Sequence, residues 1–418
     1  MEGSYSLPYG KENITFDLPK DLEVTFIRPK PIPPSRNELK EIENALDQPI
    51  EAPRFDEIKS RHRISIVISD LTRPVPHRLL LPPLLKKLDA LGIPRSLIKI
   101  IIATGQHSKV APDQFHHLVE PSWAKGIEVI CHDPIKDLVF IGRTSLGTPF
   151  WINRTFWESD FKILTGMIDP HQFVGFTGGS KIASIGLAGI KTIEANHSML
   201  THSNAKLGEV EGNPVREDID EMGRMLGIDF ILNVVLNEEN RVAKAFAGHF
   251  LKSWHEGVRL AKSLSGIQID EKMDLVITSP GGYPKDIDLY QVQKGLAHAT
   301  QILKPGGKII LVGRCVQGIG DEGFYNTIRQ SKTPQDVISK FQSQPFKMGL
   351  HKAFLLCRSL IQSKVYFYSE GISPAVIKKF FFEPISSIQQ GIEKVFPHLP
   401  SHPKIAIMPK ASSTFVIG

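Results

Sequence analysis

The segment Ile64-Ser65-Ile66-Val67-Ile68-Ser69 runs directly into Asp70-Leu71-Thr72-Arg73-Pro74-Val75-Pro76, and this junction decides the fold. A short, continuous apolar run rich in β-branched residues predicts a strand buried on both faces. Such strands are typical of parallel sheets covered by helices, where ligands bind beyond the carboxyl ends of the strands. We therefore expect an α/β fold, with a binding site beginning just after Ser69.

The same alternation of strand and helix patterns continues outward from this junction. Further strands are expected at 98–103, 127–130, 161–164, 230–236, 273–278, 308–312, 364–368 and 404–408. Helices are expected at 38–46, 78–91, 250–264 and 290–303, and another should begin at Pro214 with Asn213 as its N-cap. This pattern predicts two α/β domains with mostly parallel sheets flanked by helices, and an active site in the interdomain cleft.

The chain of 418 residues exceeds what one hydrophobic core usually covers, which also favours two domains. The polar junction 268–272 is the expected boundary. It gives an N-terminal domain of residues 1–270, joined by the C-terminal tail 404–418, and a C-terminal domain of residues 271–403.

Composition excludes several classes of function. The net charge of +6 is spread along the chain without a basic run, so nucleic acid is not an expected partner, whereas an anionic substrate is compatible. Three separated cysteines without a CxxC pair exclude zinc ribbons and thioredoxin-like motifs and fit a reducing compartment. The beginning of the chain does not resemble a secretory signal, and no apolar run approaches the roughly 20 residues that span a bilayer. We expect a cytoplasmic protein without a membrane partner.

Four clusters carry residues suited to chemistry. They are Asp70 to Pro76, Gly105-Gln106-His107, the glycine-rich stretch from Asp169 to Lys181 with Ala195-Asn196-His197, and Gly281 to Lys294 with Tyr290, Gln291 and Lys294. Arginine can hold a carboxylate with two parallel bonds, and histidine serves as a base or a metal ligand. Each cluster also has a structural interpretation, such as a capped turn, a hydrogen-bonded histidine or a solvated helix face. Gly175, Gly178 and Gly179 lack the spacing of GxGxxG, and the Walker A pattern fails as well.

In combination, the patterns DxTRPxP, PHxxxGFxGGxK, TIxANH and GYPxDxxLYQxxKG resemble the nickel-pincer lactate racemase family over nearly the whole chain. The resemblance implies a 2-hydroxyacid racemase or epimerase that inverts C2 by reversible hydride transfer through a 2-keto acid. It also implies a nickel pincer nucleotide (pyridinium-3,5-bisthiocarboxylic acid mononucleotide with nickel), supplied by cofactor-biosynthesis proteins.

The resemblance assigns roles to particular residues of this chain. Lys181 would attach the cofactor covalently, and His197 would bind the nickel. His107 and His171 would be the catalytic acid and base. The other expected cofactor contacts are Asp70, Thr72, Gly178 and Gly179, and the expected substrate contacts are Arg73, Tyr290, Gln291 and Lys294.

Two alternatives remain open at this stage. A nicotinamide-dependent 2-hydroxyacid dehydrogenase would use similar histidine and arginine residues but should carry a dinucleotide fingerprint, and a non-catalytic nickel-cofactor-binding protein would not need His107, His171 and Arg73 together. The resemblance also suggests a departure in substrate. Lactate-specific members have a tryptophan in the second domain, whereas the segment 348–360 offers His351, Phe354 and Cys357 here. A larger 2-hydroxy acid or a sugar acid would suit that difference.

Overall fold

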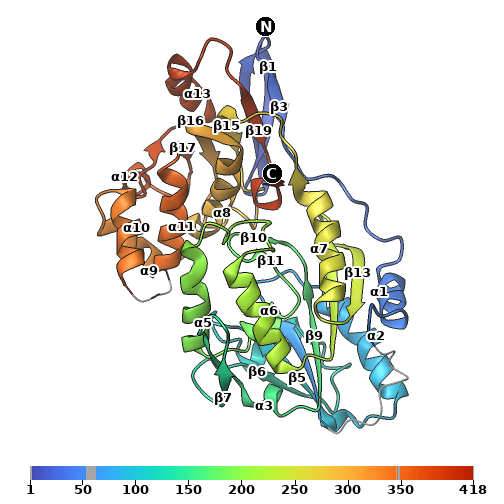
Figure 1. Cartoon of the computed structure of the whole chain (residues 1–418). Coiled ribbons are helices and arrows are strands. Elements are labelled where there is room, and N and C mark those ends of the chain that lie inside the picture. The colour runs from blue at the N-terminus through green and yellow to red at the C-terminus, as the bar shows by residue number, and fades with distance from the viewer. Residues whose placement is uncertain (1, 53–62, 345, 347–348, 418) are drawn as a thin grey trace. The chain divides into compact units, whose positions relative to one another are not determined.

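The computed structural model describes residues 2–52, 63–344, 346 and 349–417, which form two compact units (Figure 1). The middle unit spans Pro31–Leu264, and the terminal unit combines Met1–Lys30 with Ser265–Gly418. Each unit contains its own six-stranded, mostly parallel sheet with flanking helices. The expected α/β class is therefore confirmed.

The middle unit is built on a sheet with the strand order β13-β12-β9-β4-β5-β6. Its strands are β4 (Ile64–Ser69), β5 (Ile98–Ala103), β6 (Glu128–Cys131), β9 (Phe161–Met167), β12 (Phe230–Leu236) and β13 (Val242–Gly248). All neighbours are parallel except β12 and β13. The four central residues of β4 are fully buried, as its continuous apolar pattern predicts. Ser69 pairs with Ala103, so β4 and β5 end side by side.

Helices cover both faces of this sheet. The apolar faces of α1 (Glu38–Asp47) and α2 (His77–Ala90) join one core with β4, β5, β9 and β12. Ile182, at the start of α4 (Lys181–Ser184), lies against Gly166 on the other face, where a Cβ on the glycine would come within 2.3 Å of the Ile182 Cδ1 atom. The remaining helical elements are α3 (Arg154–Trp157), α5 (Ile190–Ser198), α6 (Pro214–Leu226), α7 (Lys252–Ser265), η2 (Arg95–Leu97), η3 (Pro112–His117) and η4 (Met199–Thr201).

Two short antiparallel pairs complete the middle unit. They are β7 (Leu138–Arg143) with β8 (Pro149–Asn153), and β10 (Pro170–His171) with β11 (Gly175–Phe176). The expected cap of α6 is confirmed, because the Asn213 side chain accepts hydrogen bonds from the backbone of Val215 and Arg216 and Pro214 occupies the first turn.

The terminal unit has a parallel sheet with the order β18-β17-β16-β15-β19-β3. Its strands are β3 (Val24–Phe26), β15 (Met273–Thr278), β16 (Leu303–Val312), β17 (Lys364–Tyr368), β18 (Glu383–Pro384) and β19 (Ile405–Met408). Two further pairs are β1 (Glu2–Tyr9) with β2 (Glu12–Pro19), and β14 (Gly266–Ile267) with β20 (Phe415–Val416). The helical elements are α8 (Leu289–Ala299), α9 (Glu322–Arg329), α10 (Pro334–Ser343), α11 (Leu350–Leu360), α12 (Pro374–Lys379), α13 (Ile388–Val395), η5 (Thr300–Ile302), η6 (Phe396–His398) and η7 (Ala411–Ser413).

Two features of the terminal unit differ from the sequence-based expectation. The helix expected at 290–303 ends at Ala299, because Leu303 already pairs with Met273 as the first residue of β16. The expected division placed residues 1–30 and 404–418 with the first domain. Instead, β19 lies between β15 and β3, so both ends of the chain contribute to the terminal sheet (Figure 1).

Among the described residues, no helix combines the length and the apolar character needed to cross a membrane.

Candidate active site

Asp70 and His107 meet at the carboxyl ends of β4 and β5. His107 Nδ1 lies 2.7 Å from one carboxylate oxygen of Asp70. The other carboxylate oxygen accepts hydrogen bonds from the Thr72 backbone nitrogen at 2.9 Å and the Thr72 hydroxyl at 2.6 Å. Adjacent parallel strands bring these two loops together, as the sequence pattern predicts.

The Asp70 carboxylate determines which ring nitrogen of His107 donates a hydrogen bond. Burial alone would raise the pKa of Asp70, but hydrogen bonds from His107 and Thr72 and the charge of His107 lower it overall. An ionised carboxylate only accepts hydrogen bonds, so His107 donates from Nδ1, and the neutral form of the ring has its lone pair on Nε2. The Asp70 side chain is 5% exposed and that of His107 is 41% exposed. The pair is therefore an oriented base whose imidazole is exposed.

Arg73 and Thr72 occupy the same turn. The Arg73 guanidinium lies 3.3 Å from the Thr72 hydroxyl and 3.4 Å from the Thr72 carbonyl oxygen. The expected contact of Asp70 and Thr72 with the cofactor remains a prediction. In the structure, Asp70 contacts His107, and Thr72 donates hydrogen bonds to Asp70.

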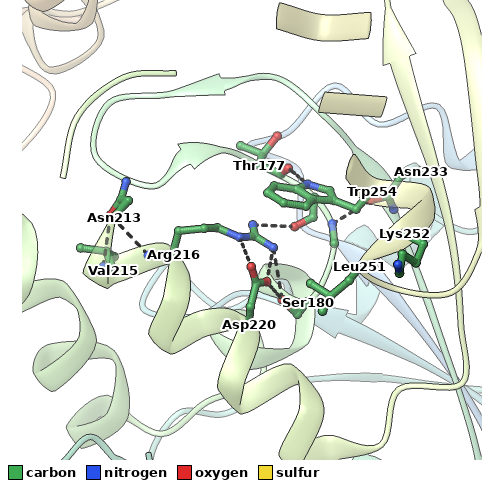
Figure 2. A network of polar contacts seen from close by, with 12 residues as sticks. Thr177, Ser180, Asn213, Val215, Arg216, Asp220, Asn233, Leu251, Lys252 and Trp254 are labelled. Carbon is green, nitrogen blue, oxygen red and sulfur yellow. Dashed lines mark hydrogen bonds and ion pairs between the residues drawn. The ribbon is translucent and has the colours of Figure 1, made fainter. Parts of the chain in front are cut away.

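The glycine-rich stretch is held by a buried network (Figure 2). The Arg216 side chain is fully buried, forms an ion pair with Asp220, and stacks with its guanidinium carbon 3.6 Å from the Trp254 ring centroid. Asp220 also accepts a hydrogen bond from the Ser180 hydroxyl at 2.7 Å, and the Trp254 indole donates to the Thr177 carbonyl oxygen at 2.8 Å. These contacts fix the backbone that precedes Lys181.

Gly178 and Gly179 are required by this network. Both have positive φ angles, of 80° and 60°. A Cβ atom at Gly178 would come within 2.8 Å of Asn233 Oδ1, and one at Gly179 within 2.9 Å of the Trp254 ring. The space beside these glycines is therefore filled by the protein itself. Their expected contact with a cofactor remains a prediction.

His171 and His197 come together around Phe173, and Lys181 lies near enough to His197 to act on its charge. The rings of His171 and His197 each meet the Phe173 ring edge-to-face, with centroid distances of 4.8 and 5.0 Å. All three polar residues are partly accessible. Burial, followed by the charges of Lys181 and His107, lowers the pKa of His197 to about 3. The fold thus brings four candidates together, with His197 neutral.

The three terminal-unit candidates lie on α8, whose N-terminus is capped by the Asp288 carboxylate. Lys294 donates a hydrogen bond to the Gln291 side chain at 2.6 Å. The ammonium of Lys352 lies 4.7 Å from the Tyr290 ring centroid. These three candidates therefore share one partly accessible helix face, with Lys352 as an added cation.

The segment 348–360 supplies most of its side chains to packing. His351, Phe354 and Cys357 are all buried in α11, and the rings of Phe354 and Phe341 are 4.6 Å apart. Met348 lies outside the described residues. Lys352 of α11, which the sequence reasoning did not single out, contacts the predicted substrate residue Tyr290. Because the surrounding segment 350–356 is mostly apolar, the sequence pattern indicated core packing rather than a site residue there.

Comparisons with known proteins agree over the whole chain. The Lactate racemase N-terminal domain family matches residues 9–208, and the Lactate racemase C-terminal domain family matches residues 269–416. A lactate racemase from Thermoanaerobacterium thermosaccharolyticum is 31% identical over 98% of both chains. One from Lactiplantibacillus plantarum is 30% identical over 98% of this chain and 99% of its own length.

Solved structures agree as well. The lactate racemase apoprotein from T. thermosaccharolyticum superposes with a TM-score of 0.94 at 31% identity, covering all of both chains. A Thermotoga maritima protein shares the fold, with a TM-score of 0.67 at 17% identity over 91% of this chain and 98% of its own. This chain belongs to the lactate racemase family and is an isomerase of the racemase type.

Proposed function

We propose that the chain inverts C2 of a 2-hydroxy acid by reversible hydride transfer through a 2-keto acid, with a nickel pincer nucleotide attached at Lys181. The observation that carries this proposal is the grouping of Lys181 and His107 around a neutral His197 within one unit. A lysine amine, a neutral imidazole and an oriented base are the groups that the reaction requires from the protein.

The described residues fit a cofactor that brings its own metal donors. They contain no group of three or more histidine, cysteine, aspartate or glutamate side chains that could hold a metal ion. The protein would instead supply one ligand, the uncharged His197 imidazole, which suits nickel. When bound, the nickel pincer nucleotide would supply a reversible acceptor for hydride.

The two histidines would handle the hydroxyl proton. His107, oriented by Asp70, can remove it at Nε2 while hydride leaves C2, because imidazole exchanges protons near neutral pH. The resulting keto acid is planar and can accept hydride on either face. His171 would serve as the acid or base for the opposite enantiomer.

In the middle unit, Arg73 is suited to bidentate binding of the substrate carboxylate. In the terminal unit, Lys294, Tyr290 and Gln291 would offer the substrate a cation and hydrogen-bond donors. We propose lactate as the first substrate to test, because the relatives that match the whole chain are lactate racemases. The buried packing of α11 without a tryptophan makes larger 2-hydroxy acids the next choice.

Deuterium at C2 tests the mechanism. The cofactor-loaded enzyme would be supplied with one enantiomer of [2-²H]lactate in ordinary water, and then with larger 2-hydroxy acids. We expect the opposite enantiomer to form with its deuterium retained, because the hydride returns to the same carbon. Wash-out of deuterium in step with inversion would instead indicate deprotonation at C2 and would overturn the hydride proposal.

A further inference from the structure

The Asn196 side chain can be oriented unambiguously from its partners. Its amide nitrogen lies 3.1 Å from the Val215 carbonyl oxygen and 2.8 Å from an Asp218 carboxylate oxygen. Both partners are acceptors, so the amide nitrogen must face them. The amide oxygen then faces His197, whose Nδ1 is 2.9 Å away.

This orientation fixes the proton on the His197 ring. An amide oxygen only accepts hydrogen bonds, so His197 must donate from Nδ1. In the neutral imidazole the lone pair is then on Nε2.

A further chain of hydrogen bonds holds Asn196 itself. The Thr144 hydroxyl accepts from the Thr148 backbone nitrogen at 3.1 Å and donates to the second carboxylate oxygen of Asp218. Thr144, Thr148, Asn196 and Asp218 are all buried. Every bond in the chain therefore has a defined direction, from the turn between β7 and β8, across α6, to α5.

We propose that the buried chain Thr144–Asp218–Asn196 positions His197 as a metal ligand by holding it in the Nδ1–H tautomer, with Nε2 presented to nickel. The inference rests on the proposed function for the identity of the metal. Hydrogen bonds to the second ring nitrogen of a histidine ligand typically set its tautomer and ring orientation, and losing them weakens metal binding. Asn196 and Asp218 are positioning residues, since they act through His197.

The helix α6 then supports both expected cofactor attachments. Asp218 accepts a hydrogen bond from Asn196, which orients His197. Asp220, two residues later, binds Ser180 and Arg216, and these hold the backbone that precedes Lys181. One helix would thus set the relative position of the covalent and the metal-binding attachment.

The tautomer can be measured in the apoprotein, without cofactor or activity. With ¹⁵N-labelled histidine, we expect wild-type His197 to show a protonated Nδ1 and an unprotonated Nε2. Asn196→Ala should move the ring toward the Nε2–H form, while the control Ser198→Ala, on the exposed side of the same helix, should leave it unchanged. A wild-type Nε2–H tautomer, or an unchanged tautomer in Asn196→Ala, would overturn the proposal.

Metal retention provides the second readout. Cofactor-loaded Asn196→Ala should lose nickel to a chelator about 10- to 100-fold faster than wild type or Ser198→Ala. Equal loss rates would overturn the positioning role. If wild-type protein carried no nickel on His197, the proposed function would fail, whereas the apoprotein tautomer would still report on the hydrogen-bond chain. Should Asn196→Ala not fold, the wild-type measurement and Asp218→Ala test the same point.

Discussion

Two regions of the middle unit each orient a histidine through Nδ1, but they use different partners. Beyond β4 and β5, His107 is exposed and bound to the carboxylate of Asp70. On α5, His197 is partly buried and bound to the neutral amide of Asn196. The Asp70 carboxylate orients the His107 ring, which suits a residue that exchanges a proton at Nε2. The Asn196 amide orients the His197 ring, while burial and the charges of Lys181 and His107 keep that ring uncharged, which suits a metal ligand.

Removing the Lys181 amine should have the largest effect on activity, because the proposed cofactor would then lose its covalent attachment beside both histidines. Lys181→Arg keeps the positive charge but cannot form the expected linkage. Racemase activity should fall to background, as measured by chiral chromatography. Lys191→Arg, exposed on α5, is the matched control and should remain active. Full activity in Lys181→Arg would exclude a covalent role.

Replacing His107 or its partner Asp70 tests the proposed role of this pair as the catalytic base. His107→Gln should lower kcat by about 10²- to 10⁴-fold, and Asp70→Asn by on the order of 10²-fold with little change in KM, because the base would lose its charged partner. Steady-state kinetics in both directions would measure this. Asp113→Asn, in the exposed η3, serves as the control. An Asp70→Asn enzyme with wild-type kcat would remove Asp70 from the account.

The buried ion pair Arg216–Asp220 and the exposed ion pair Arg154–Glu158 have the same i,i+4 spacing, so their contributions to stability can be compared. Asp220→Ala leaves the Arg216 charge buried and should cost about 3 to 5 kcal/mol of unfolding free energy. The exposed pair Arg154–Glu158 has the same i,i+4 spacing, so Glu158→Gln should change stability by less than about 1 kcal/mol. Urea unfolding of the apoprotein would measure both. Similar costs would show that burial of the pair is not what holds the glycine-rich stretch.

Three other histidines provide a third kind of environment, because each ring contacts a backbone carbonyl oxygen instead of a carboxylate or an amide side chain. Burial lowers the pKa of His77, His132 and His298 from 6.5 to about 4. Between those values the unfolded chain binds more protons, so stability should fall as pH drops below about 6.5, by up to about 1.4 kcal/mol per pH unit for each ring. Their NMR signals should stay constant from pH 8 to 5.5. A titration of any of them near pH 6.5 would contradict the effect of burial.

Much of the site follows from local sequence patterns. The meeting of Asp70 and His107 follows from two apolar strands ending in parallel, and the start of α6 follows from Asn213-Pro214. Both depend on rules that act over a few residues.

The supporting network could not be predicted in this way. Arg216 and Asp220 look like an exposed i,i+4 pair on an amphipathic helix, and only the packing of Trp254 shows that they are buried. The place of β19 between β15 and β3 likewise depends on strand order, which local patterns do not encode.

The most direct test of the central claim is the intact mass of the protein produced together with the cofactor-building enzymes, followed by peptide mapping and nickel analysis. The account predicts a mononucleotide-sized adduct on Lys181 and bound nickel that is lost when His197 is replaced by alanine. An unmodified Lys181, in protein from a host shown to make the cofactor, would contradict it and leave only the fold in common with the relatives.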